Sequence, residues 1–294
     1  MRRREFIALL GGVAAASPLA ALAQSSEHVR RIGVLMNSSP NDPGLYHQYS
    51  EELVAFAPDV VLAATSQSVG ALQQVSKKVP IVFAGVIDPV GAGFVHSMAR
   101  PATNATGFTA FEYSISGKWL EMLKEFVPTL KRVAVLRDPA LAAGIGQFAV
   151  IQSLAASTQL ELSAIDSRDF GETERALNDF AQEPDGGLIV TASPSAFAYR
   201  EPIFSLATRL RLPSIAAFRY YATAGGLASY GPDLISDFPR AAGYVNSVLK
   251  GAKVAELPVQ APTSYQLVVN VRTARKIGIE IPDTLLSRAN EVIE

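Results

Sequence analysis

The chain has 294 residues, of which 49% are hydrophobic and 18% are charged, and its formal net charge is −1. This composition excludes a disordered chain. The balanced charge argues against a nucleic-acid-binding protein, which would carry a clustered basic face. Because the sequence contains no cysteine, it has neither disulfides nor a thiolate metal site. The length favours two domains over one.

Residues 1–23 have the pattern of an export signal. The basic stretch "RRREF" precedes a short apolar segment, and "ALA" ends at Ala23 as a small-x-small cleavage site. The arginine pair followed by x-Phe-Ile resembles the twin-arginine motif, while an ordinary secretory signal stays open. Since both routes cross the inner membrane of a bacterium, we expect cleavage near Ala23 and a periplasmic protein.

Beyond this signal, Val- and Ile-rich runs alternate with segments of helical pattern. Strands are predicted at 31–36, 59–65 and 80–86, with helices at 46–57 and 67–78 between them. Such an alternation predicts βαβ units, in which helices cover both faces of a parallel sheet.

The same alternation continues after residue 114 with five further βα repeats. A predicted helix at 115–127 carries its large apolar residues on one stripe, as an amphipathic helix requires. The sequence therefore predicts an α/β fold with two Rossmann-like lobes, whose open, mainly parallel sheets are joined by a multi-strand hinge. The predicted boundaries are 27–110 plus 225–255 for lobe 1 and 112–222 plus 258–294 for lobe 2.

Two strand exits repeat one pattern, in "IVFAGVIDPVGAG" (81–93) and "VAVLRDPALAAG" (133–144). Open α/β sheets bind ligands outside the carboxyl ends of their strands, so Asp88 and Asp138 are predicted to face one cleft. There they would accept hydrogen bonds from a ligand amino group or order the strand-exit loops. Asp-Pro is also a common way to open a turn, and that interpretation stays open for each pair.

Hydroxyl groups and aromatic rings also gather near predicted strand ends and crossovers. The stretches "ATSQS" (64–68) and "TASPS" (191–195) place hydroxyls where helices begin, and helix starts attract carboxylates. Aromatic rings beside them suit a small molecule with an apolar body and a charged end. N-capping and core packing are the alternatives. The candidate ligand-binding residues are Thr65, Ser66, Thr191 and Ser193 with their hydroxyls, and Phe111, Tyr113, Phe218 and Tyr220 with their rings.

No sequence pattern supports catalysis. Gly144-x-Gly146 with Asp166 resembles a dinucleotide fingerprint, but the first glycine comes too late after its strand, so we expect no cofactor. The three histidines are scattered, which predicts no metal site. A nucleophile elbow and a P-loop are both absent from the sequence. A two-lobed nucleotide- or sugar-processing enzyme stays as an alternative.

Four phrases closely resemble one protein family: "DPVGAGFVHSMARPATNATGF", "GKWLEMLKEFVPTLKRVAVLRDP", "GGLASYGPD" with "RAAGYVNSVLKG", and "LPVQAPTSYQLVVNVRTARKIGIEIP". The family is that of the ABC-transporter substrate-binding proteins of the tryptophan/tyrosine-binding type. The resemblance implies a type I periplasmic-binding-protein fold that closes about a hinge on a small ligand, usually an aromatic amino acid. It also implies delivery to an ABC permease and its ATPase, without catalysis. We expect a monomer.

The sequence departs from this family in the first lobe. "MNSSPNDPGLYHQYSEELVAFAPDVV" passes from the first strand to the second through one helix, so about one βα unit is missing. The absent strand would lie at the edge of the sheet, which would leave strand 31–36 exposed there. A remnant that binds no ligand, or a sensory partner with the same fold, is therefore a further alternative.

Overall fold

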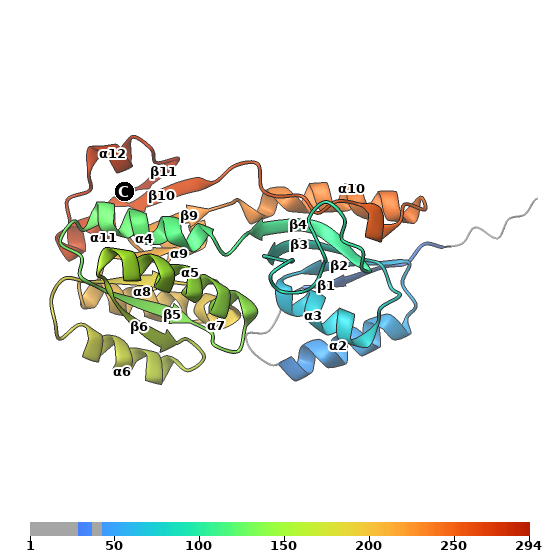
Figure 1. Cartoon of the computed structure of the whole chain (residues 1–294), viewed down its shortest axis with the longest axis horizontal. Helices are drawn as coiled ribbons and strands as arrows, with labels where there is room; N and C mark the ends of the chain where they lie inside the picture. Colours follow the sequence, from blue (N-terminus) through green and yellow to red (C-terminus); the bar gives the residue numbers. More distant parts are fainter. Residues whose placement is uncertain (1–28, 37–42) are drawn as a thin grey trace, which may run out of the picture. The chain divides into compact units, whose positions relative to one another are not determined.

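A computed structural model describes residues 29–36 and 43–294. The predicted export signal lies outside the described residues. Residues from Ile32 to Glu294 form one unit, which contains two β-sheets with their covering helices (Figure 1). Within the described part of the chain, no helix is both long and apolar enough to cross a membrane.

The first sheet has four strands in the order β1–β2–β3–β4, and every neighbouring pair is parallel. Helices α2 and α3 pack on one face of this sheet and α10 on the other (Figure 1). The strands are β1 (Ile32–Leu35), β2 (Val60–Ala64), β3 (Ile81–Ile87) and β4 (Ala105–Phe111), and the helices are α2 (Pro43–Ala55), α3 (Ser66–Val75) and α10 (Asp237–Leu249).

Strand β2 shows why both faces need a cover. Successive side chains of a strand point to opposite faces, and all but one of its five residues are buried. Val61 packs in the cluster that contains Leu72 of α3, whereas Val60 packs with Ala241 and Val245 of α10. A helix from far along the chain therefore completes the core of the first sheet.

The second sheet has seven strands in the order β11–β10–β9–β8–β7–β5–β6. Its neighbouring strands are parallel except for β9 and β10, which are antiparallel. The strands are β5 (Arg132–Arg137), β6 (Glu161–Asp166), β7 (Gly186–Val190), β8 (Ser214–Ala216), β9 (Ala228–Gly231), β10 (Gln266–Asn270) and β11 (Glu291–Ile293).

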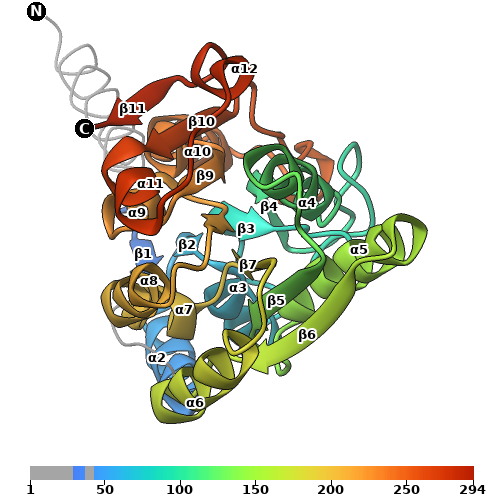
Figure 2. The ribbon, with the colours of Figure 1, turned by 90° about the vertical axis from the view of Figure 1, so that its left-hand side faces the viewer.

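Helices cover both faces of the second sheet, with α4 and α5 on one side and α6, α8 and α11 on the other (Figure 2). Short helices fill several of the connections. The long helices are α4 (Ile115–Phe126), α5 (Ala142–Thr158), α6 (Phe170–Phe180), α8 (Arg200–Arg209) and α11 (Val271–Ile277), and the short ones are α7 (Pro194–Ala198), α9 (Arg219–Thr223), α12 (Asp283–Leu286) and the 3₁₀ turns Leu234–Ser236 and Val254–Glu256.

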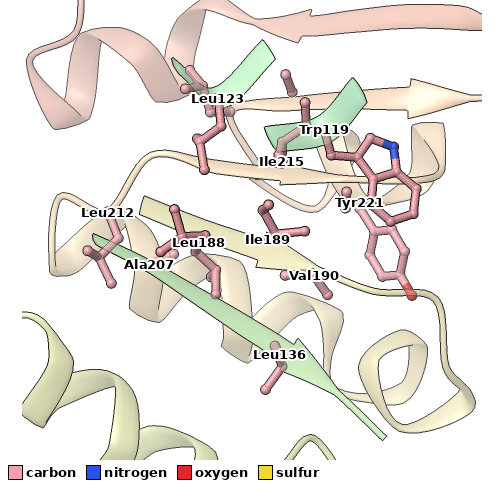
Figure 3. Packing of buried hydrophobic residues seen from close by; sticks show 14 of the residues in the cluster. Trp119, Leu123, Leu136, Leu188, Ile189, Val190, Ala207, Leu212, Ile215 and Tyr221 are labelled. Carbon is pink, nitrogen blue, oxygen red and sulfur yellow. The ribbon is translucent and has the colours of Figure 1, made fainter. Parts of the chain in front are cut away.

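The core of the second sheet confirms the apolar stripe predicted for helix 115–127. Trp119 and Leu123 of α4 are fully buried in the same cluster as Leu188 and Ile189 of β7 (Figure 3). The indole Nε1 of Trp119 donates to the carbonyl of Tyr230 at 2.8 Å, so its one polar atom is satisfied.

The observed architecture confirms the predicted fold class, an α/β fold with open, mainly parallel sheets. One predicted lobe boundary disagrees with the way the strands pair. The sequence interpretation returns the chain to lobe 1 at residue 225, but β9 pairs with β8 and β10 in the second sheet. Among residues 225–255, α10 packs on the first sheet and the turn Val254–Glu256 contacts β4, so the chain returns to the first sheet after Gly231.

Strand β1 lies at the edge of the first sheet, where the sequence predicts strand 31–36. Its apolar residues Ile32 and Val34 are each 52% exposed, whereas Leu35 is buried. Helix α10 covers β2, β3 and β4 but leaves the face of β1 that carries Ile32 and Val34 exposed.

Candidate ligand-binding cavity

A cavity of about 380 Å³ lies at the carboxyl ends of strands from both sheets. This is where parallel sheets bring their loops and helix starts together, and the volume lies within the range of small-molecule sites. The lining is mainly apolar. It consists of Met36, Ala64, Thr65, Ser66, Gln67, Ala84, Gly85, Ile87, Ala92, Phe94, Ala140, Leu141, Ala142, Ala143, Ala192, Ser193, Pro194, Phe197, Phe218, Tyr220, Leu234 and Phe238.

The start of α3 forms one wall of the cavity. Thr65 caps the helix, and its hydroxyl accepts from the backbone N–H of Ser68 at 3.4 Å. The hydroxyl of Ser66 accepts from the N–H of Ile87 at 3.2 Å, which ties α3 to the end of β3. Gly85 has φ of +73°, where the register with β4 shifts. Since this conformation favours glycine, the sequence permits the irregular strand end that lines the cavity.

Serine hydroxyls that follow β6 and β7 form a second polar patch. Ser193 caps α7, with its hydroxyl accepting from the N–H of Ala196 at 3.1 Å. Its Oγ lies 3.0 Å from that of Ser195, which lies 2.7 Å from that of Ser167. Thr191, predicted to take part in the site, is fully buried and donates to the carbonyl of Leu136 at 2.9 Å. Its hydroxyl therefore stabilises the junction of β5 and β7 instead of lining the cavity.

Aromatic rings form one part of the apolar wall. Phe197 meets Tyr220 edge to face with ring centroids 5.0 Å apart, and Phe218 lies 5.3 Å from Tyr220. The guanidinium of Arg200 lies over the outer ring of this group, 4.5 Å from the centroid of Phe197. Burial raises the pKa of Tyr220 well above its ordinary value, so its hydroxyl stays protonated into the alkaline range.

The two Asp-Pro carboxylates do not line the cavity. Asp88 has φ of +38°, and its carboxylate accepts from the N–H of Gly91 at 2.7 Å and from that of Tyr113 at 3.4 Å. The carboxylate of Asp138 is buried and accepts from the N–H of Ala140 at 2.9 Å. Both carboxylates therefore hold their own strand-exit loops in place, which is one of the two roles predicted for them.

Phe111 and Tyr113, predicted to flank the ligand, also lie outside the lining. Phe111 is fully buried and packs against Trp119 and Phe218, with centroids 5.8 and 5.5 Å away. It therefore supports the cavity wall from behind. Tyr113 packs where side chains at Gly91 and Gly146 would otherwise lie.

Packing also explains the Gly144-x-Gly146 pattern. A Cβ at Gly144 would lie 2.1 Å from the carbonyl oxygen of Asp138, and one at Gly146 would lie 2.2 Å from the Tyr113 ring. Both glycines thus permit close approach of the start of α5 to its neighbours. This packing accounts for the glycine spacing without a nucleotide.

A family model described as "ABC transporter substrate binding protein" matches residues 20–293. The chain belongs to this family. It is 23% identical over 255 residues to a tyrosine-binding protein of Clostridioides difficile (strain R20291), covering 85% of this chain and 71% of that protein.

Two solved structures share the fold. A conserved domain protein from Vibrio cholerae O1 biovar El Tor superposes with a TM-score of 0.80 and 27% identity, over 85% of this chain and 84% of that one. The ABC domain in complex with L-Trp from Streptococcus pneumonia superposes with a TM-score of 0.82 and 22% identity, over 90% of this chain and 99% of that one. The family and these neighbours identify a substrate-binding protein of an ABC transporter.

Half of the predicted site residues of this substrate-binding protein meet at the cavity. Thr65, Ser66, Ser193, Phe218 and Tyr220 line it, whereas Asp88, Phe111, Tyr113, Asp138 and Thr191 do not. Sequence reasoning missed Phe94, Leu141, Phe197, Leu234 and Phe238.

A sequence signal exists for one of the missed residues, Phe197, which lies two residues after "TASPS" (191–195). An aromatic residue within one turn of a hydroxyl-rich helix start is a pattern that predicts Phe197 as a ligand-binding residue.

Proposed function

We propose that this chain is the periplasmic solute-binding component of an ABC importer. It captures a small carboxylate-bearing ligand, an aromatic amino acid or a related aromatic acid, in the cavity at the carboxyl ends of the two sheets. It then delivers this ligand, as a monomer, to a permease with its ATPase at the inner membrane.

One observation carries the ligand class: the cavity joins an aromatic wall to two hydroxyl-bearing helix starts. Phe197, Phe218 and Tyr220 offer apolar surface to a flat body. Thr65 and Ser66, at the start of α3, offer hydrogen bonds and the positive end of a helix dipole to a carboxylate. The tyrosine-binding relative and the L-Trp complex support the same class.

Thermal unfolding of the purified full chain tests this function. A panel would contain aromatic amino acids, aromatic carboxylates, sugars and short aliphatic acids. A ligand that binds only the folded form raises the unfolding midpoint with its concentration. We expect saturable shifts with aromatic compounds alone. A cooperative transition that no compound moves would contradict the proposal and favour a remnant or sensory partner instead.

A further inference from the structure

A second cavity, of about 750 Å³, lies at the amino ends of β3 and β4. This is the opposite end of the first sheet from the strand ends that line the candidate ligand-binding cavity. Its lining comes from three segments, which are residues 73–80 at the end of α3, residues 93–104 before β4 and residues 252–255 after α10. The lining is mainly polar, so the second cavity suits a different kind of ligand.

Three lysines and one histidine line the second cavity, and they come from all three segments. Lys77 and Lys78 follow α3, His96 lies in the loop before β4, and Lys253 follows α10. Lys77 and Lys78 are exposed and have no ion-pair partner among the described residues. Lys253 pairs with Glu256 at 3.1 Å, and both of these side chains are exposed. The fold thus brings basic groups to one hollow, which favours an anion.

Hydrogen bonds tie the walls of the second cavity together. Gln73 is 7% exposed, and its Nε2 donates to the carbonyl of Phe94 at 3.0 Å and to Oδ1 of Asn104 at 3.3 Å. The hydroxyl of Thr103 donates to the same carbonyl at 3.0 Å. Nδ2 of Asn104 donates to two carbonyls of the segment after α3, at 3.0 and 2.8 Å. The hollow is therefore preformed, which lowers the entropic cost of binding a ligand there.

The helix dipole offers a simpler explanation for some of these cations. A lysine that follows a helix interacts favourably with the negative end of the dipole, and Lys77, Lys78 and Lys253 all follow helices. That effect binds no anion by itself. It also does not account for His96, which follows a strand and lies in a loop. Charge removal at a second helix end separates the two explanations.

We propose that the second cavity binds the phosphate group of a phosphate ester. Lysine binds phosphate as a point charge. The tetrahedral oxygens of a phosphate point to several sides and suit cations from three segments, whereas a carboxylate has two coplanar oxygens. The volume is that of a small-molecule site, so it holds the phosphate together with the group that carries it. The proposed function concerns the other cavity, so each proposal can fail alone.

Isothermal titration of the purified full chain with glycerol 3-phosphate tests the proposal at low ionic strength. We expect saturable binding that glycerol does not show and that added NaCl weakens, because salt screens exposed charges. Phe94 lines both cavities, whereas Lys77 and Lys78 line the second alone. A chain with Lys77→Gln and Lys78→Gln should therefore bind about ten-fold more weakly or worse.

The matched control removes two positive charges from another helix end. Arg275 and Lys276 lie in the last turn of α11, and a chain with Arg275→Gln and Lys276→Gln should keep its affinity within about two-fold. All four side chains are exposed, so both double variants should fold. An equal loss of affinity in the two variants overturns the proposal, because it would show attraction to net charge without a site.

Vesicles separate the two sources of a phosphate ester. Phosphatidylglycerol vesicles present the phosphate in a lipid headgroup, and neutral phosphatidylcholine vesicles are the control. Binding of glycerol 3-phosphate alone assigns the second cavity to a soluble monoester. Binding of phosphatidylglycerol vesicles alone, lost in the Lys77→Gln and Lys78→Gln chain, assigns it to a lipid headgroup. A native chain that binds neither overturns the proposal.

Discussion

Tyr113 occupies the space that a side chain at position 146 would need. A Cβ built on Gly146 lies 2.2 Å from Cδ2 of Tyr113, and one built on Gly91 lies 2.8 Å from Cε2 of the same ring. The backbone N–H of Tyr113 donates to the carboxylate of Asp88. One ring thus connects the loop after β3 with helix α5, which belongs to the other sheet.

Gly146→Ala should destabilise the protein because the added methyl group must displace Tyr113. Overpacking of this kind costs about 1–3 kcal/mol, measured as a lower free energy of unfolding in urea. Gly243→Ala in α10 is the matched control, since nothing lies within 4 Å of its Cβ position. Alanine is the better helix former by about 1 kcal/mol, so the control should gain stability. Equal effects of the two substitutions would refute the packing role of Tyr113.

Phe197→Ala and Phe111→Ala should separate binding from folding. Phe197 lines the cavity and is 40% exposed, so its removal should weaken binding of an aromatic acid about ten-fold, which corresponds to about 1.4 kcal/mol. Phe111 is fully buried behind the wall, and its truncation should lower the free energy of unfolding by about 3–5 kcal/mol. Titration with an aromatic acid measures the affinity of both variants, and urea unfolding measures their stability. A Phe197→Ala variant with native affinity would place the ligand elsewhere.

Asp138→Ala should affect stability and leave binding unchanged. The substitution removes the acceptor for the N–H of Ala140, which costs about 1–2 kcal/mol at a buried position. Because Asp138 does not line the cavity, the affinity for an aromatic acid should stay within about two-fold of the native value. A ten-fold loss of affinity without a loss of stability would restore the role of Asp138 as a ligand partner.

Two adjacent tyrosines should make the protein sensitive to alkali. Burial raises the pKa of Tyr220 and of Tyr221 in the folded protein, whereas both ionise near pH 10 in the unfolded chain. The unfolded state therefore loses these protons first, so stability is complete below about pH 10 and falls as pH rises above it.

Tyr221→Phe tests this mechanism. The buried Tyr221 hydroxyl lies near the Tyr220 hydroxyl and the backbone of Ser193 but meets neither with good hydrogen-bond geometry, so its removal should change the free energy of unfolding at pH 7 by no more than about 1 kcal/mol. The decline above pH 10, followed by urea unfolding across pH, should become shallower. A loss of more than about 1 kcal/mol at pH 7 would show that the hydroxyl has a stabilising partner.

The strands could be predicted from sequence because buried parallel strands have a strong signature. Predicted strands at 31–36, 59–65 and 80–86 correspond to β1 (32–35), β2 (60–64) and β3 (81–87). The predicted lobe boundary at 225 differs from the structure because the stretch "GLASYG", which forms β9, has a strand pattern that fits either sheet. The antiparallel pairing of β9 with β10 joins segments far apart in the chain, and the local sequence pattern does not predict it.

The site was harder to predict because residue type does not determine which way a side chain points. Asp88 and Asp138 do follow strands, but both carboxylates accept hydrogen bonds from their own loops and neither residue lines the cavity. Phe238 is spaced with Ala242, Val245 and Leu249 as one apolar stripe of a helix, which predicts a core residue, yet it lines the cavity. Hydroxyls at helix starts were the more reliable signal, because the fold fixes where a helix start after a parallel strand must lie.

Helix α10 has a consequence for the order in which the protein acquires its structure. Its residues Ala241 and Val245 cover Val60, Val82 and Phe108 of the first sheet, although they are synthesised more than 120 residues after this sheet ends. A nascent chain that has completed β4 therefore keeps one apolar sheet face in water until residue 249 has emerged. Exposed faces of this kind attract chaperones and aggregate. The amino-terminal third cannot mature first and alone, and its folding must wait for nearly the whole polypeptide.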